Sequence, residues 1–132
     1  MPEHKILLAD HSPTVQTLFL SFFEKSGLPE PIIVYDVDSA LKAFEENEIE
    51  VYFIEFALPG QPGVDLVKTI MEKNDKAFIV MLSVAASKDN IKEAMEAGVQ
   101  AVVQKPFHPS KIIELIHKYE LRSAKAHKFE QW

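Results

Sequence analysis

The stretch VYFIEFALPG, residues 51–60, decides how this chain of 132 residues is interpreted. Four apolar residues lead directly into an acid, Glu55, and the pair Pro59-Gly60 marks a turn. A short continuous apolar run is typical of a strand that is buried on both faces of a parallel sheet. The carboxyl ends of such strands are where open α/β sheets place their functional groups. Glu55 is therefore the first candidate functional residue.

Short apolar runs and longer helical stripes alternate along the rest of the chain. The runs that predict strands span residues 5–9, 31–35, 51–54, 77–82 and 99–104. The stripes that predict helices span residues 13–25, 39–47, 64–73, 88–97 and 109–121. Ser12 and Ser87 have the character of N-cap residues, and Gly27 and Gly98 end their helices.

This alternation predicts an α/β fold. Five strands, each followed by a helix, favour one five-stranded parallel sheet with helices on both faces, because right-handed crossovers require that layering. We expect a single domain over residues 1–132, with its core at about 4–121. Residues 122–132 are predicted to form a polar C-terminal tail that frays.

Composition excludes several classes of function. The formal net charge of −6 gives no sign of binding to nucleic acid or to an anionic membrane. The chain contains no cysteine, which excludes disulfides, thiol nucleophiles and zinc–thiolate sites and favours a cytoplasmic protein. The first residues are too polar for a signal peptide, and no apolar run reaches the length of a membrane span.

Polar residues follow four of the predicted strands. They are Asp10 and His11, Glu55, Ser83, and Lys105 with Pro106. The carboxyl ends of parallel strands lie at one edge of a sheet, so these side chains should converge. Two acids, an imidazole, a hydroxyl and a lysine together suit a phosphoryl or metal site.

Four segments in this order, KILLADHSPT, VYFIEFALPGQPG, FIVMLSVAAS and AVVQKPF, resemble the receiver domains of bacterial two-component response regulators. The resemblance covers about residues 4–121 and implies a flavodoxin-like fold. In that family two acids after the first strand and an aspartate after the third hold magnesium, and that aspartate accepts a phosphoryl group. Asp10 matches the first acid, Ser83 the phosphate-binding hydroxyl and Lys105 the phosphate-binding lysine. The family also implies a cis bond before Pro106.

Three positions depart from the family pattern. His11 replaces the second acid, Glu55 replaces the phospho-accepting aspartate, and Val102 replaces an aromatic switch residue. An imidazole is a poor magnesium ligand, and the extra methylene of Glu55 moves its carboxylate by roughly an ångström from the in-line position. We therefore expect a degenerate pseudo-receiver that binds no magnesium, is not an enzyme, and signals without aspartyl phosphorylation.

The longer reach of Glu55 gives a further expectation. Its carboxylate should enter the place of a phosphoryl group, pair with Lys105 and accept a hydrogen bond from Ser83. That arrangement would hold the domain in one state, either active-like or locked in a conformation of its own.

Other interpretations stay open. Glu55 is alternatively a solvated loop acid, and His11 an inert loop histidine. Asp10, His11 and Glu55 are candidates for a zinc or manganese cluster. The domain is alternatively a genuine phospho-accepting receiver that depends on a metal. A small flavodoxin-like cofactor protein is the last alternative, although the loop ADHSPT lacks a glycine-rich phosphate cradle.

The last predicted helix carries more apolar residues than one core-facing stripe requires. They are Ile112, Ile113, Leu115, Ile116 and Tyr119. One interpretation is a broad buried helix. The other is a face for a signalling protein or a second copy, formed by the fourth helix, fifth strand and fifth helix, where the family usually docks. In the fourth predicted helix, Ile91, Ala94 and Met95 are expected to face the core.

Overall fold

The computed structural model describes the backbone of residues 5–130 and the side chains of residues 5–124. Within this region five strands form one parallel sheet in the order β2-β1-β3-β4-β5. They are β1 (Ile6–Ala9), β2 (Ile32–Val34), β3 (Val51–Glu55), β4 (Phe78–Ser83) and β5 (Ala101–Gln104). The helices of the same region are α1 (Pro13–Lys25), α2 (Val37–Glu46), α3 (Gly63–Lys73), α4 (Lys88–Ala97) and α5 (Pro109–Glu130). The predicted fold class is confirmed.

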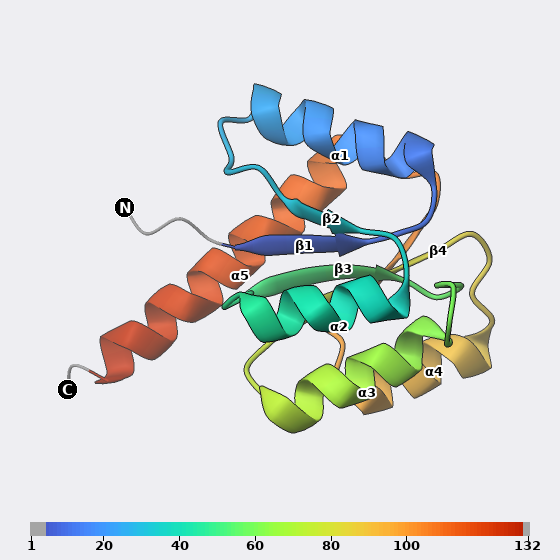
Figure 1. The fold of residues 1–132 in the computed structure, drawn as a ribbon. Helices are drawn as coiled ribbons and strands as arrows, with labels where there is room; N and C mark the ends of the chain where they lie inside the picture. Colours follow the sequence, from blue (N-terminus) through green and yellow to red (C-terminus); the bar gives the residue numbers. More distant parts are fainter. Residues whose placement is uncertain (1–4, 131–132) are drawn as a thin grey trace.

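Side chains that alternate along the strands divide the core into two layers. Leu7 and Ala9 of β1 pack with residues of α2, α3 and α4, whereas Ile6 and Leu8 pack with α1 and α5. The helices accordingly cover both faces of the sheet (Figure 1). β3 is buried over its whole length, including Glu55 at its carboxyl end. Glu55 is therefore a buried acid at the carboxyl edge of the sheet.

Capping groups fix the loop after β1. The Ser12 hydroxyl accepts a hydrogen bond from the backbone N–H of Val15, and Pro13 occupies the start of α1, as predicted.

Asp36 caps α2 in a reciprocal pair with Ser39, so this helix begins two residues before the predicted Ser39.

Aromatic packing holds the segment after β5. Phe107 contacts the ring of Phe19 edge-on, with centroids 5.8 Å apart, and Phe19 also packs against Phe53 of β3. The peptide bond between Lys105 and Pro106 is cis, as predicted. The segment that follows Lys105 is thus fixed by the packing of Phe107 against Phe19 in the core between α1 and the sheet.

The predicted end of the last helix is wrong. α5 continues past Leu121 to Glu130, and its far end projects beyond the strands (Figure 1). Arg122 ties the first residue of this continuation to the domain, because its guanidinium lies over the rings of Phe78 and Tyr119 and donates a hydrogen bond to the Lys76 carbonyl at 2.7 Å. The remaining part of the predicted tail, residues 131–132, lies outside the described residues.

One burial prediction is also wrong, and one open choice is decided. Ile91 and Met95 are exposed, and of the three α4 residues expected in the core only Ala94 is buried. On α5 burial supports the interpretation of a broad buried helix over that of a docking face. Four of its apolar residues are buried against the sheet and Ile113 is half-buried; the four are Ile112, Leu115, Ile116 and Tyr119. The long helix covers a large sheet face and needs a broad apolar stripe, whereas α4 contacts the domain along a narrow one.

No helix within residues 5–130 is both long and apolar enough to cross a membrane.

Candidate functional site

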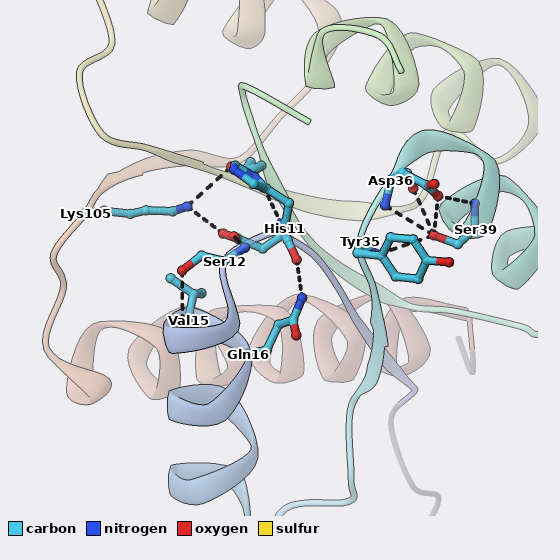
Figure 2. Close-up of polar contacts among 10 residues, drawn as sticks. His11, Ser12, Val15, Gln16, Tyr35, Asp36, Ser39 and Lys105 are labelled. Carbon is cyan, nitrogen blue, oxygen red and sulfur yellow. Dashed lines mark hydrogen bonds and ion pairs between the residues drawn. The ribbon is translucent and has the colours of Figure 1, made fainter. Parts of the chain in front are cut away.

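The predicted polar residues converge at the carboxyl edge of the sheet. Asp10, Glu55 and Ser83 are buried, while 54% of the His11 side chain is exposed. Lys105 extends from the end of β5 toward the loop that carries His11 and Ser12 (Figure 2). The edge therefore holds two buried carboxylates with one ammonium between them.

Lys105 pairs with both carboxylates. Its Nζ lies 2.6 Å from Asp10 Oδ2 and 3.5 Å from Glu55 Oε1. The backbone N–H of Lys105 also donates to the Ser83 carbonyl at 2.6 Å, which ties β5 to β4 beside the site. The expected pairing of Glu55 with Lys105 is present, but Asp10 is the closer partner.

Glu55 is held mainly by His11. Oε2 of Glu55 lies 2.5 Å from the backbone nitrogen of His11 and 2.5 Å from its Nδ1. The backbone N–H donates to the carboxylate, and the short contact with the ring is a second hydrogen bond in which Nδ1 and Oε2 share one proton. Both oxygens of this carboxylate are therefore engaged, one by His11 and the other by Lys105.

The expected contact between Ser83 and Glu55 is wrong. Among the described residues, no hydrogen bond joins the Ser83 hydroxyl to the Glu55 carboxylate. The carboxylate turns toward His11 because that residue offers two hydrogen-bonding groups, its backbone N–H and its ring Nδ1. An acid at position 11 would repel a neighbouring carboxylate. The two departures from the family pattern, His11 and Glu55, thus complement each other.

Asp10 is fixed by its own loop. Its Oδ1 accepts from the backbone N–H of Ser12 at 2.8 Å, and its carbonyl accepts from the side-chain amide of Gln16 at 2.7 Å. Burial raises the pKa of the Asp10 carboxyl, and Lys105 and the Ser12 N–H act in the opposite direction. Gln16 was missed in the sequence because a spacing of six residues from Asp10 carries no recognisable signal.

Replacing Asp10 by asparagine is expected to raise the free energy of unfolding at pH 7 by on the order of 1 kcal/mol. A raised pKa means that the folded state holds the Asp10 proton more tightly than the unfolded state. Below the ordinary pKa of 3.8 the Asp10 carboxyl is protonated in both states, and no buried charge destabilises the fold. As the pH rises through the pKa of the folded state, the buried carboxyl ionises and the free energy of unfolding falls. Urea unfolding of both proteins from pH 7 down to pH 3.8 should show the gain of the variant shrinking. A gain that grows in acid would contradict this account.

A cleft of 590 Å³ opens beside Glu55. Ser83 and Lys105 line it together with Asp65 of α3 and Asn90 and Glu93 of α4. The sequence alone did not mark these three helix residues, since they follow no strand end.

Val102, predicted as the switch position, is half-buried and packs on the core beneath α4.

Comparisons with known proteins agree with this fold. The family model for the response regulator receiver domain matches residues 6–117. The chain is 23% identical to the chemotaxis protein CheY of Thermotoga maritima over 114 residues, which is 86% of this chain and 95% of that protein. It is 27% identical to CheY of Pseudomonas aeruginosa over 116 residues, which is 86% of this chain and 94% of that protein.

Solved structures are similar over nearly the whole chain. A CheY-like receiver domain protein from Methanospirillum hungatei JF-1 superposes with a TM-score of 0.87 at 21% identity, over 94% of this chain and 99% of the other. This likeness supports the flavodoxin-like arrangement of one parallel sheet between two helical layers. With the match of the family model over most of its length, the chain belongs to the response regulator receiver domain family of two-component signalling.

Proposed function

We propose that this receiver domain signals through protein–protein contacts, without magnesium and without accepting a phosphoryl group. The observation that carries the proposal is the double contact of His11 with Glu55, from the backbone nitrogen and from Nδ1, each 2.5 Å from Oε2. This contact occupies the side chain that stands where the family places its phospho-accepting aspartate.

The chemistry of phosphoryl transfer supports the proposal. An acceptor carboxylate needs an oxygen that is free to approach phosphorus in line with the leaving group. Oε2 of Glu55 accepts from His11, and Oε1 faces the Lys105 ammonium at 3.5 Å. A glutamate is also one methylene longer than the aspartate, so even a free oxygen would be displaced from the in-line position.

The ion pairs favour a domain that is locked in a conformation of its own over an imitation of the phosphorylated state. Lys105 is held at 2.6 Å by Asp10, and the Glu55 carboxylate turns away from Ser83 toward His11. The place that a phosphoryl group would take next to Ser83 is open as part of the cleft. Val102 is aliphatic and has no ring to rotate.

Output then depends on surfaces that are already formed. We place the docking face on α4, β5 and α5, where Ile91, Met95 and Leu121 are exposed apolar side chains. The partner is a signalling protein or a second copy of the chain, and the setting is cytoplasmic.

The test is exposure of the purified protein to acetyl phosphate and magnesium, read by intact mass. The natural chain is expected to show no phosphoryl adduct, whereas the variant with Glu55→Asp and His11→Asp should gain one. Glu55→Asp alone is the matched control, since it restores the acceptor and keeps the imidazole. An adduct on the natural chain would refute the proposal and favour a genuine phospho-accepting receiver.

A further inference from the structure

The cleft beside Glu55 is large enough for a small organic molecule. Its volume of 590 Å³ falls within the range of about 300–1,000 Å³ that is usual for ligand sites in proteins. Residues from the start of α3, the end of β4 and the length of α4 line it. Much of the wall is apolar and consists of Phe56, Pro62, Val64, Leu82 and Val84. The cleft therefore suits a ligand with an apolar body.

The hydroxyl of Ser83 is an unpartnered polar group in this cleft. Ser83 is only 5% exposed, and its hydroxyl makes no hydrogen bond to any other residue that the structure describes. The side chain lines the cleft, and its oxygen is not sealed in the core. Buried polar groups in proteins normally have a hydrogen-bond partner. The hydroxyl therefore points to a ligand with a polar group at this end of the cleft.

Asp65 supplies a charge that is not compensated. Two of the other charged groups that line the cleft, Glu55 and Lys105, pair with each other. Glu93 of α4 pairs with Lys68 of α3 at 3.5 Å. Asp65 is half-buried in the first turn of α3 and has no ion pair with any described residue. A first turn favours an acid by itself, so Asp65 gains its meaning from the neighbouring buried hydroxyl.

We propose that the cleft binds a small organic monocation, namely an apolar body that carries one ammonium group. The ammonium group would bind the Asp65 carboxylate and the Ser83 hydroxyl, and the apolar body would lie against Val64 and Val84. An ammonium has three N–H donors, so it satisfies both oxygen groups at once. The inference goes beyond the proposed loss of phosphorylation, because it assigns a ligand to the domain.

An anion suits the cleft less well than a cation. Lys105 is the one basic side chain among the described residues that line it. Its Nζ already lies 2.6 Å from Asp10 Oδ2 and 3.5 Å from Glu55 Oε1, so no free positive charge faces the cleft. A phosphate would therefore meet the uncompensated charge of Asp65 without a cation of its own.

Magnesium, the metal that the family implies, does not fit the edge behind the cleft. It prefers oxygen ligands in near-octahedral geometry. Here the Lys105 ammonium lies 2.6 Å from Asp10 Oδ2, and a ring nitrogen of His11 stands beside Glu55 where a second acid is expected.

A bound ligand would connect the cleft with the outer face of α4. Asn90 and Glu93 line the cleft, and the exposed side chains of Ile91 and Met95 lie on the same helix. Occupation of the cleft is then an input that reaches the docking face in place of a phosphoryl group. This consequence rests on the proposed docking face, whereas the binding site itself does not.

The test is a titration of the isotope-labelled whole chain with benzylamine at pH 7, followed by NMR through the backbone amide shifts. Saturable shifts are expected at Ser83, Val84 and Asn90, with a Kd of about 1 mM or lower. Benzyl alcohol has a similar body without the charge, and sodium phosphate supplies the anion; neither should saturate these shifts. Equal binding of benzyl alcohol or saturable binding of phosphate would overturn the proposal, as would the absence of benzylamine binding.

Three variants locate the site. Asp65→Asn is expected to weaken benzylamine binding by about tenfold or more, and Ser83→Ala by about threefold. Asp89→Asn is the matched control, since Asp89 is an exposed acid in the first turn of α4 and does not line the cleft. It should leave the affinity unchanged. Equal affinity in the natural chain and in Asp65→Asn would refute the proposed site. The titration contains no phosphoryl donor, so this proposal and the preceding one fail separately.

Discussion

Replacing Gly63 by alanine is expected to lower the free energy of unfolding by about 3 kcal/mol or more. A Cβ at this position would overlap the backbone carbonyl oxygen of Glu55 and touch Met81 Cε at 3.0 Å. The carbonyl belongs to β3, which is paired in register with β4 at Glu55 and Leu82, so the backbone has little room to retreat. The Gly63 N–H also donates to the Phe56 carbonyl at 2.8 Å and closes the loop beside the site.

Urea unfolding measures this effect, and Gly27→Ala provides the control. Gly27 has a left-handed φ of +69°, yet a Cβ there meets no atom within 4 Å. Its substitution carries only the backbone strain of about 1–2 kcal/mol. A smaller loss at Gly63 than at Gly27 would contradict the steric account. If Gly63→Ala folds, its α3 must move away from the end of β3.

Lys105→Met is expected to lower the free energy of unfolding at pH 7 by about 2–4 kcal/mol. The change leaves the Asp10 and Glu55 carboxylates at the buried edge without their shared cation. The Lys105 side chain is 12% exposed, so solvent compensates only in part. The loss should shrink as the pH falls toward 3.8, because burial already raises the pKa of Asp10 and loss of the ammonium raises it further.

Lys68→Met is the matched control for this experiment. Lys68 pairs with Glu93 at 3.5 Å, but both side chains are about half exposed. Removal of such a surface pair is expected to change stability by no more than about 1 kcal/mol. Adding Asp10→Asn to Lys105→Met should recover part of the loss, since one unpaired charge is then absent. Equal effects of the two lysine substitutions would contradict the buried ion-pair account.

Local sequence patterns were sufficient for the sheet and for several helix boundaries. Short apolar runs predicted the five strands, because strands buried on both faces carry no alternation with polar residues. Ser12 and Ser87 marked the starts of α1 and α4 through their side-chain oxygens. The passage of α5 beyond Leu121 was not predictable in this way, because the next residue, Arg122, contacts Phe78, which is distant in the sequence.

The membership of the candidate site was also accessible from the sequence, but its contacts were not. Topology places the ends of β1, β3 and β5 at one edge, so Asp10, Glu55 and Lys105 had to meet there. Glu55 had three groups within reach of its flexible side chain: His11, Ser83 and Lys105. The choice among them depends on the exact positions of these groups in the folded chain, which no pattern of residues encodes.

The sequence by itself determined the fold, the family and the identity of the residues that replace the usual acids. Only the tertiary structure decided that Glu55 pairs with His11, 44 positions away, and that Lys105 lies closest to Asp10. It likewise decided that the apolar stripe of α5 is core while Ile91 and Met95 of α4 face solvent. The physical reason is the distance along the chain over which each interaction acts. Strand, helix and cap preferences act between near neighbours, whereas burial and ion pairing depend on which distant segments the sheet order brings together.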